Sequence, residues 1–160
     1  MSSYFLKNLY LNQELKLEEY EQIPYPRTEL HIHVMYKATQ MFSLLGFAVV
    51  GPITCLVKTK GLSQIANYAP KMGTRGLALG LIMGPIMTEA TIRNATQDAI
   101  YDRSFRLRHN KRQLNADRFS TFGLLGGLAI HRLASFNPIT VMAAGYVLGF
   151  VASMAIPVKE

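Results

Sequence analysis

Few side chains of this sequence have the type and spacing that chemistry requires. Four histidines are present, and two of them, His31 and His33, are separated by a single residue. Two imidazoles are too few for a metal site, and the other two, His109 and His131, lie far away along the chain. The single cysteine, Cys55, lies in an apolar stretch and is expected to be a buried, inert thiol. We therefore expect no metal site and no cofactor.

Catalytic motifs are equally sparse. The sequence has no paired carboxylates, no nucleophile elbow and no phosphate-binding loop. Glu89 is the one acidic residue within a long apolar stretch, and Arg93 follows it at the spacing of a helical ion pair. The alternative for Glu89 is a proton relay or a translocation path. We expect a protein that is not an enzyme.

Glycines at a spacing of four are the clearest pattern in the chain. They lie on one face of a helix, where the absence of a side chain lets another helix approach closely in lipid. The contacts could join helices of this chain or of partner proteins. The pattern predicts helix packing at seven glycines: Gly76, Gly80, Gly84, Gly123, Gly127, Gly145 and Gly149.

The composition indicates the medium in which these helices pack. Hydrophobic residues make up 49% of the 160 residues and charged residues only 17%, whereas soluble domains carry about 25% charged residues. Residues 119–130 and 139–158 carry no charge at all. We predict an all-α membrane protein, with a soluble all-helical domain with glycine-rich core helices as the alternative.

The predicted domain is a bundle of four transmembrane helices with small-xxx-small packing, preceded by a polar N-terminal arm over residues 1–33. Each span is close to the ~20 residues that cross a bilayer core. Pro52 is expected to kink the first helix. Asn137 and Pro138 predict a cap and a tight turn, which makes the last two spans an antiparallel hairpin. The spans are predicted at residues 34–57, 73–92, 119–136 and 138–157.

The connector over residues 93–118 contains seven bases and three acids. Its position between apolar segments is typical of a membrane-flanking loop and not of a nucleic-acid-binding face. Asn115 or Asp117 is expected to cap the helix that follows. The bases either set the topology or bind anionic lipid, such as cardiolipin. The candidate lipid contacts are Arg103, Arg106, Arg108, Lys111 and Arg112.

Tyr101, Arg112 and Asp117 precede a glycine cluster that begins at Gly123. This order of residues, together with four glycine-rich spans, resembles the signature of the Tim17/Tim22/Tim23 family. The spacing from Arg112 to Asp117 is one residue longer than in that signature. The family contains mitochondrial protein-import subunits and the B14.7-type accessory subunit of respiratory complex I.

The resemblance implies a multi-pass protein of the mitochondrial inner membrane whose partners are other membrane subunits and phospholipids, with no nucleic acid. The favoured function is a structural subunit of a respiratory complex, and a lipid-binding scaffold is one alternative. Another is a translocase component, whose polar path would use Gln40, Thr88, Glu89, His131 and Arg132.

The orientation has two conflicting predictions. With four spans, twelve of the 17 bases lie on the side of the termini and of the 93–118 connector. The positive-inside rule places that side in the matrix, whereas the family resemblance places the termini in the intermembrane space.

Overall fold

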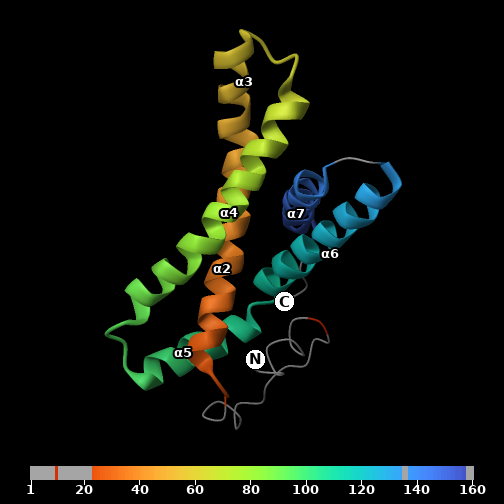
Figure 1. The fold of residues 1–160 in the computed structure, drawn as a ribbon. Helices are drawn as coiled ribbons and strands as arrows, with labels where there is room; N and C mark the ends of the chain where they lie inside the picture. The colour runs from red at the N-terminus through yellow and green to blue at the C-terminus, as the bar shows by residue number, and fades with distance from the viewer. Residues whose placement is uncertain (1–9, 11–22, 135–136, 158–160) are drawn as a thin grey trace.

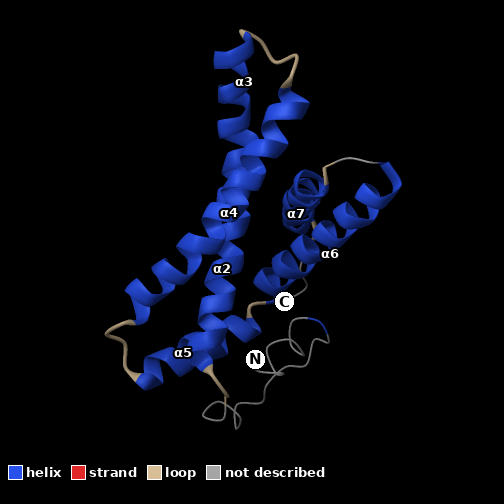
Figure 2. Ribbon diagram, in the orientation of Figure 1, coloured by secondary structure: helices blue, strands red, loops and turns tan. Residues whose placement is uncertain are grey.

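The computed structural model describes residue 10 and residues 23–134 and 137–157, and all regular structure within them is helical (Figures 1 and 2). Two long antiparallel helix pairs form most of the molecule, and a shorter helix joins them at one end (Figure 1). The first pair is more extended than the second. Residues 1–9 and 11–22, most of the predicted N-terminal arm, lie outside the described residues.

The first rod combines three helical segments in direct succession: α2 (Pro26–Leu45), the π-helical turn η2 (Gly46–Val50) and α3 (Gly51–Thr59). It begins within the predicted arm because Pro26, with its fixed φ, occupies the first helical turn. The residue before it, Tyr25, is left-handed with φ of 59°, and not extended as two flanking prolines suggest.

Pro52 modifies this rod without breaking it. A proline cannot donate a backbone hydrogen bond, and its ring crowds the carbonyl four residues earlier. The chain widens to π-helical geometry just before it, and the backbone N–H of Gly51 donates to the carbonyl of Gly46, five residues back. Where the sequence predicts a kink at Pro52, the structure has a π-helical turn just before it.

The second rod, α4 (Ile65–Ile92), runs antiparallel to the first and packs along its length (Figure 1). It begins eight residues before the predicted span at 73–92, so most of the expected connector belongs to the helix. Pro70 and Pro85 both lie inside α4. Packing against the first rod stabilises the helix across both prolines, an effect that local propensity does not include.

The basic connector is itself largely helical. It contains α5 (Gln97–His109), where the Thr96 side chain accepts a hydrogen bond from the Ala99 N–H at 3.3 Å. The next helix, α6 (Lys111–Ala134), follows directly, and Asn110 caps it by accepting from the Gln113 N–H at 3.1 Å. The prediction that Asn115 or Asp117 caps this helix is wrong, since both lie inside α6. The basic segment has enough helix-forming residues to extend α6 towards its N-terminus.

The last helix, α7 (Pro138–Ala155), packs against α6 in the antiparallel direction. The Asn137 side chain accepts from the Thr140 N–H at 3.1 Å, and Pro138 occupies the first helical position. The predicted cap is therefore confirmed.

Two helical segments are long and apolar enough to cross a membrane: Pro26–Thr59 and Pro138–Ala155. Only 28% of the most apolar stretch in each is buried within the chain. Charged side chains lower the hydropathy of the other two long helices. They include Lys71, Arg75 and Glu89 on α4, and Lys111, Arg112, Asp117, Arg118 and Arg132 on α6.

Candidate functional site

Three predicted glycines form the contact between α4 and α2. A Cβ atom on Gly84 would lie 2.5 Å from the Cα of Met35, and one on Gly80 would lie 2.5 Å from the Cα of Thr39. A Cβ on Gly76 would overlap the carbonyl oxygen of Phe42. The ladder therefore lies at a contact between two helices of this chain, where the backbones touch without side chains between them.

The same contact continues beyond the predicted ladder. A Cβ on Gly51 would lie 2.5 Å from the Cα of Ala69, and one on Gly46 would overlap the carbonyl of Met72. These two glycines are separated by five residues and not four, because the π turn between them adds a residue. A search for an α-helical spacing misses this pair for that reason.

The four remaining predicted glycines lie between α6 and α7. Gly123 and Gly145 face each other, so that a Cβ on either would overlap the backbone carbonyl of the other. A Cβ on Gly127 would lie 2.5 Å from the Val141 carbonyl oxygen, and one on Gly149 would overlap the Phe119 carbonyl. Both helix pairs are therefore held by glycine seams.

A network of buried polar side chains joins the two helix pairs. Its first part is an ion pair in which Arg108 of α5 donates to both carboxylate oxygens of Glu29 on α2, with Nε to Oε2 at 2.8 Å. Only 1% of Glu29 and 3% of Arg108 is exposed. The Ser104 hydroxyl, which is also buried, donates to the Pro26 carbonyl at 2.9 Å. These contacts fix α5 across the start of α2.

The second part of the network surrounds Asp117 on α6, of which 1% is exposed. The amide nitrogen of Gln40 donates to Asp117 Oδ1 at 2.8 Å and to the Ser120 hydroxyl at 3.1 Å. Asp117 Oδ2 lies 3.6 Å from His33 Nδ1. His33 Nε2 contacts the amide nitrogen of Gln113, so the imidazole lies between Gln113 and this carboxylate.

Hydroxyl groups form the third part. Thr39 on α2 and Tyr146 on α7 share a hydrogen bond at 2.7 Å, and Tyr36 and Thr121 share one at 3.2 Å. Together the network contacts α2, α5, α6 and α7. Sequence reasoning missed it, although polar residues recur along α2 at helical spacing: Glu29, His33, Tyr36, Gln40 and Ser43.

The predicted lipid contacts differ in their accessibility. Arg108 is excluded, because it is buried in its ion pair with Glu29. Arg106 is exposed and pairs with Asp102 at 2.8 Å. Arg103 is exposed on α5, and Lys111 and Arg112 lie at the start of α6.

The predicted ion pair of Glu89 with Arg93 is wrong. Glu89 lies 3.5 Å from His31 instead, because the start of α2 packs beside the end of α4. His31 Nδ1 also lies 2.8 Å from the Arg27 carbonyl oxygen. Glu89 is about half exposed at this edge of the helix pair.

The residues predicted for a translocase path are dispersed over the structure. Gln40 and Thr88 are buried, whereas Glu89 is exposed near one end of the molecule and Arg132 is exposed near the end of α6 with His131 beside it. Cys55 is buried, as predicted, and donates from Sγ to the Gly61 carbonyl at 3.2 Å.

The structure also places His109 and the signature residue Tyr101 apart from these side chains. His109 Nδ1 lies 2.9 Å from the Phe105 carbonyl oxygen, and Tyr101 is partly buried on α5. Within the described ranges, no three His, Cys, Asp or Glu side chains are grouped as a metal ion requires.

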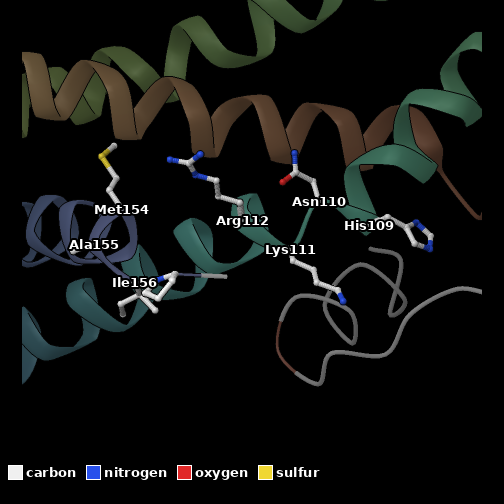
Figure 3. Close-up of a pocket in the computed structure, with 8 residues that line it drawn as sticks. His109, Asn110, Lys111, Arg112, Met154, Ala155 and Ile156 are labelled. Carbon is white, nitrogen blue, oxygen red and sulfur yellow. The ribbon is translucent and has the colours of Figure 1, made fainter. Parts of the chain in front are cut away.

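The largest cavity described, about 720 Å³, lies where α5 meets α6, beside the end of α7. A smaller cavity of about 240 Å³ adjoins it, and both are lined by Asn110, Arg112 and Met154. In Figure 3 the Arg112 side chain extends towards α2, whereas Lys111 points away from it. The two cavities bring basic side chains and an apolar helix end together.

The sequence matches one protein-family model, described as a protein of unknown function (DUF1757), over residues 5–158. The chain therefore belongs to this family. The comparison with curated proteins found no match.

Proposed function

We propose that this member of the DUF1757 family is a non-catalytic structural subunit of a mitochondrial inner-membrane respiratory complex, with the membrane arm of complex I as the favoured site. In this proposal four helices cross the membrane: Pro26–Thr59, α4, α6 and α7. The protein stabilises the complex by helix packing and lipid contacts, and no chemical step is assigned to it.

The observation that carries the membrane part is the distribution of polarity. The interior contains a carboxylate–guanidinium pair and a buried aspartate network, whereas large apolar side chains cover the outside. A soluble protein rarely exposes large apolar patches, whereas lipid favours an apolar exterior around a polar interior. Side chains more than half exposed include Ile53, Val57, Ile82, Ile86, Phe122, Leu125, Leu133 and Leu148.

The glycine seams support inclusion of α4 and α6 among the spans. Association of helices in lipid depends on close backbone approach, and both α4 and α6 pack through glycine contacts against a helix apolar enough to span. The part of α4 that contains the ladder carries no charge, with Arg75 before it and Glu89 after it. Long cationic side chains there can extend to the headgroups.

The assignment to a respiratory complex comes from the resemblance of Tyr101, Arg112, Asp117 and the following glycines to the Tim17/Tim22/Tim23 signature. A translocase component remains the alternative within that resemblance. The dispersed positions of Gln40, Glu89 and Arg132 favour the structural role, because a path for polypeptide requires polar side chains that follow one another across the membrane.

The test is native electrophoresis of mitochondrial membranes in mild detergent, with this chain followed by mass spectrometry. We expect it to co-migrate with complex I or its supercomplexes. Migration with presequence or carrier translocases would support the alternative, and migration alone at low mass would refute both.

A further inference from the structure

The two cavities share Asn110, Arg112 and Met154 as lining residues, and we name the surface that they form together the basic groove. It is defined by Lys37 of α2, by Asn110, Arg112 and Gln113 around the start of α6, and by Phe150 and Met154 of α7. Three helices far apart in the sequence therefore contribute to its walls. Neither the glycine seams nor the buried network uses Arg112.

The polar wall of the groove is cationic. Lys37 Nζ lies 5.9 Å from the centre of the Phe150 ring and donates to the Gln40 side chain at 3.2 Å. Arg112 is exposed and lines both cavities. Lys111 and His109 line the outer cavity, and the described residues that line the two cavities include no carboxylate. The groove is therefore suited to an anion.

Apolar side chains also line the groove, and they belong to the end of a helix that is long and apolar enough to cross a membrane. α7 ends at Ala155, and its last two turns place Phe150 and Met154 against the groove, followed by Ile156. The end of a spanning helix lies where the hydrocarbon core meets the headgroups. A ligand that binds here would contact both cationic and apolar side chains. An amphipathic anion would therefore fit the groove.

We infer that the basic groove binds the phosphate headgroup of an anionic phospholipid, with Arg112 and Lys37 on the phosphate and the start of an acyl chain along Phe150 and Met154. A guanidinium group matches the geometry of phosphate oxygens, and an ammonium group adds a point charge. The inference rests on the membrane placement in the proposed function and does not depend on which complex contains the protein.

The experiment is native mass spectrometry of the full chain in detergent, titrated with dioleoyl phosphatidylglycerol or with phosphatidylcholine of the same chains. We expect retention of one phosphatidylglycerol in preference to phosphatidylcholine. Arg112→Gln should weaken retention by about fivefold, since each basic side chain near anionic lipid contributes about 1 kcal/mol and a tenfold change corresponds to about 1.4 kcal/mol. Arg112→Lys should retain part of the binding, and Lys37→Met with Arg112→Gln should remove the preference.

The matched control is Arg93→Gln, which removes an exposed charge at the end of α4 outside the groove and should leave retention unchanged. An equal loss in this control would show a diffuse charge effect and overturn the inference, as would the absence of any phosphatidylglycerol preference. Displacement by inorganic phosphate or glycerol 3-phosphate at equal concentration would show a site for soluble anions instead. Helical circular dichroism of each variant excludes loss of fold as the cause.

Flotation of the same variants with vesicles separates this inference from the proposed function. If the unmodified chain and its variants all float, but none of them prefers phosphatidylglycerol, only the lipid site is refuted. Failure of the unmodified chain to float refutes the membrane part of the proposed function.

Discussion

Glu29 and Arg108 are 79 residues apart in the sequence and form a pair that water hardly reaches. The energy of such a pair depends on both partners, because removal of one leaves the other as a buried, unpaired charge. Arg106 and Asp102 form an exposed pair on the same helix, which gives an internal comparison.

Arg108→Met should therefore lower the free energy of unfolding by about 3–5 kcal/mol. The double variant Glu29→Met with Arg108→Met should recover most of this loss, since neither charge then remains buried. Unfolding of the detergent-solubilised protein by sodium dodecyl sulfate, followed by circular dichroism, measures these changes.

The control is Arg106→Met, for which we expect a loss of at most about 1 kcal/mol because solvent screens an exposed pair. If Arg108→Met and Arg106→Met destabilised the protein equally, the buried pair would have no special structural role.

At the scale of the helices, some glycines lie at a contact with another helix and others face open space. A Cβ on Gly80 would lie 2.5 Å from the Cα of Thr39, whereas one on Gly126 would have no atom within 4 Å apart from its own helix and chain neighbours. Both glycines are in helix interiors, so a substitution at either position gains similar helix propensity. The difference between the two variants then reports packing alone.

We expect Gly80→Leu to separate α2 from α4 and to lower the unfolding midpoint strongly, since overpacking costs about 1–3 kcal/mol or more. Gly126→Leu should leave the midpoint unchanged or raise it slightly. The measurement is thermal unfolding of both purified variants in the same detergent. Equal midpoints would mean that the α2–α4 seam does not hold the hairpin together.

The helices also show how far sequence reasoning reaches. The spacing of four at Gly76, Gly80 and Gly84 predicts a packing face, because an α-helix repeats close to that period. Gly46 and Gly51 could not be recognised in the same way, since the π turn that aligns them forms only in the folded rod. The helical content of α5 could not be predicted either, because its high charge is equally typical of a loop between membrane spans.

The buried network could not be derived from the sequence for a different reason. The polar stripe along α2 is visible from its spacing, but Glu29 and Gln40 are paired with side chains of α5 and α6. Which helices meet is decided by the seams and by the connection through α5. Arg108 therefore could not be distinguished from the exposed bases around it before the structure was known.

At the scale of the whole molecule, four crossings would place α5 and the α3–α4 connection on opposite sides of the membrane. This follows because α4 alone would separate Lys60 from Arg103. The arrangement can be tested with single cysteines, since the natural thiol of Cys55 is buried and can be replaced by alanine.

In that background we expect cysteines at Lys60 and Arg103 to react with a membrane-impermeant maleimide from opposite sides of intact mitoplasts. Labelling after detergent lysis serves as the control for accessibility. The side on which Arg103 reacts also decides between the two predicted orientations. If both positions reacted from the same side, α4 could not be a single membrane crossing between them.

The long-range pairs have a consequence for the order in which the protein is made. Gln40 is synthesised 77 residues before Asp117, and Glu29 precedes Arg108 by 79 residues. When the first helix pair leaves the ribosome, Glu29 and Gln40 lack their partners on α5 and α6, although the glycine seam of the pair is already complete. The polar contacts of the first hairpin are thus completed only when α5 and α6 arrive, and a chain truncated after α4 would carry Glu29 without its guanidinium partner.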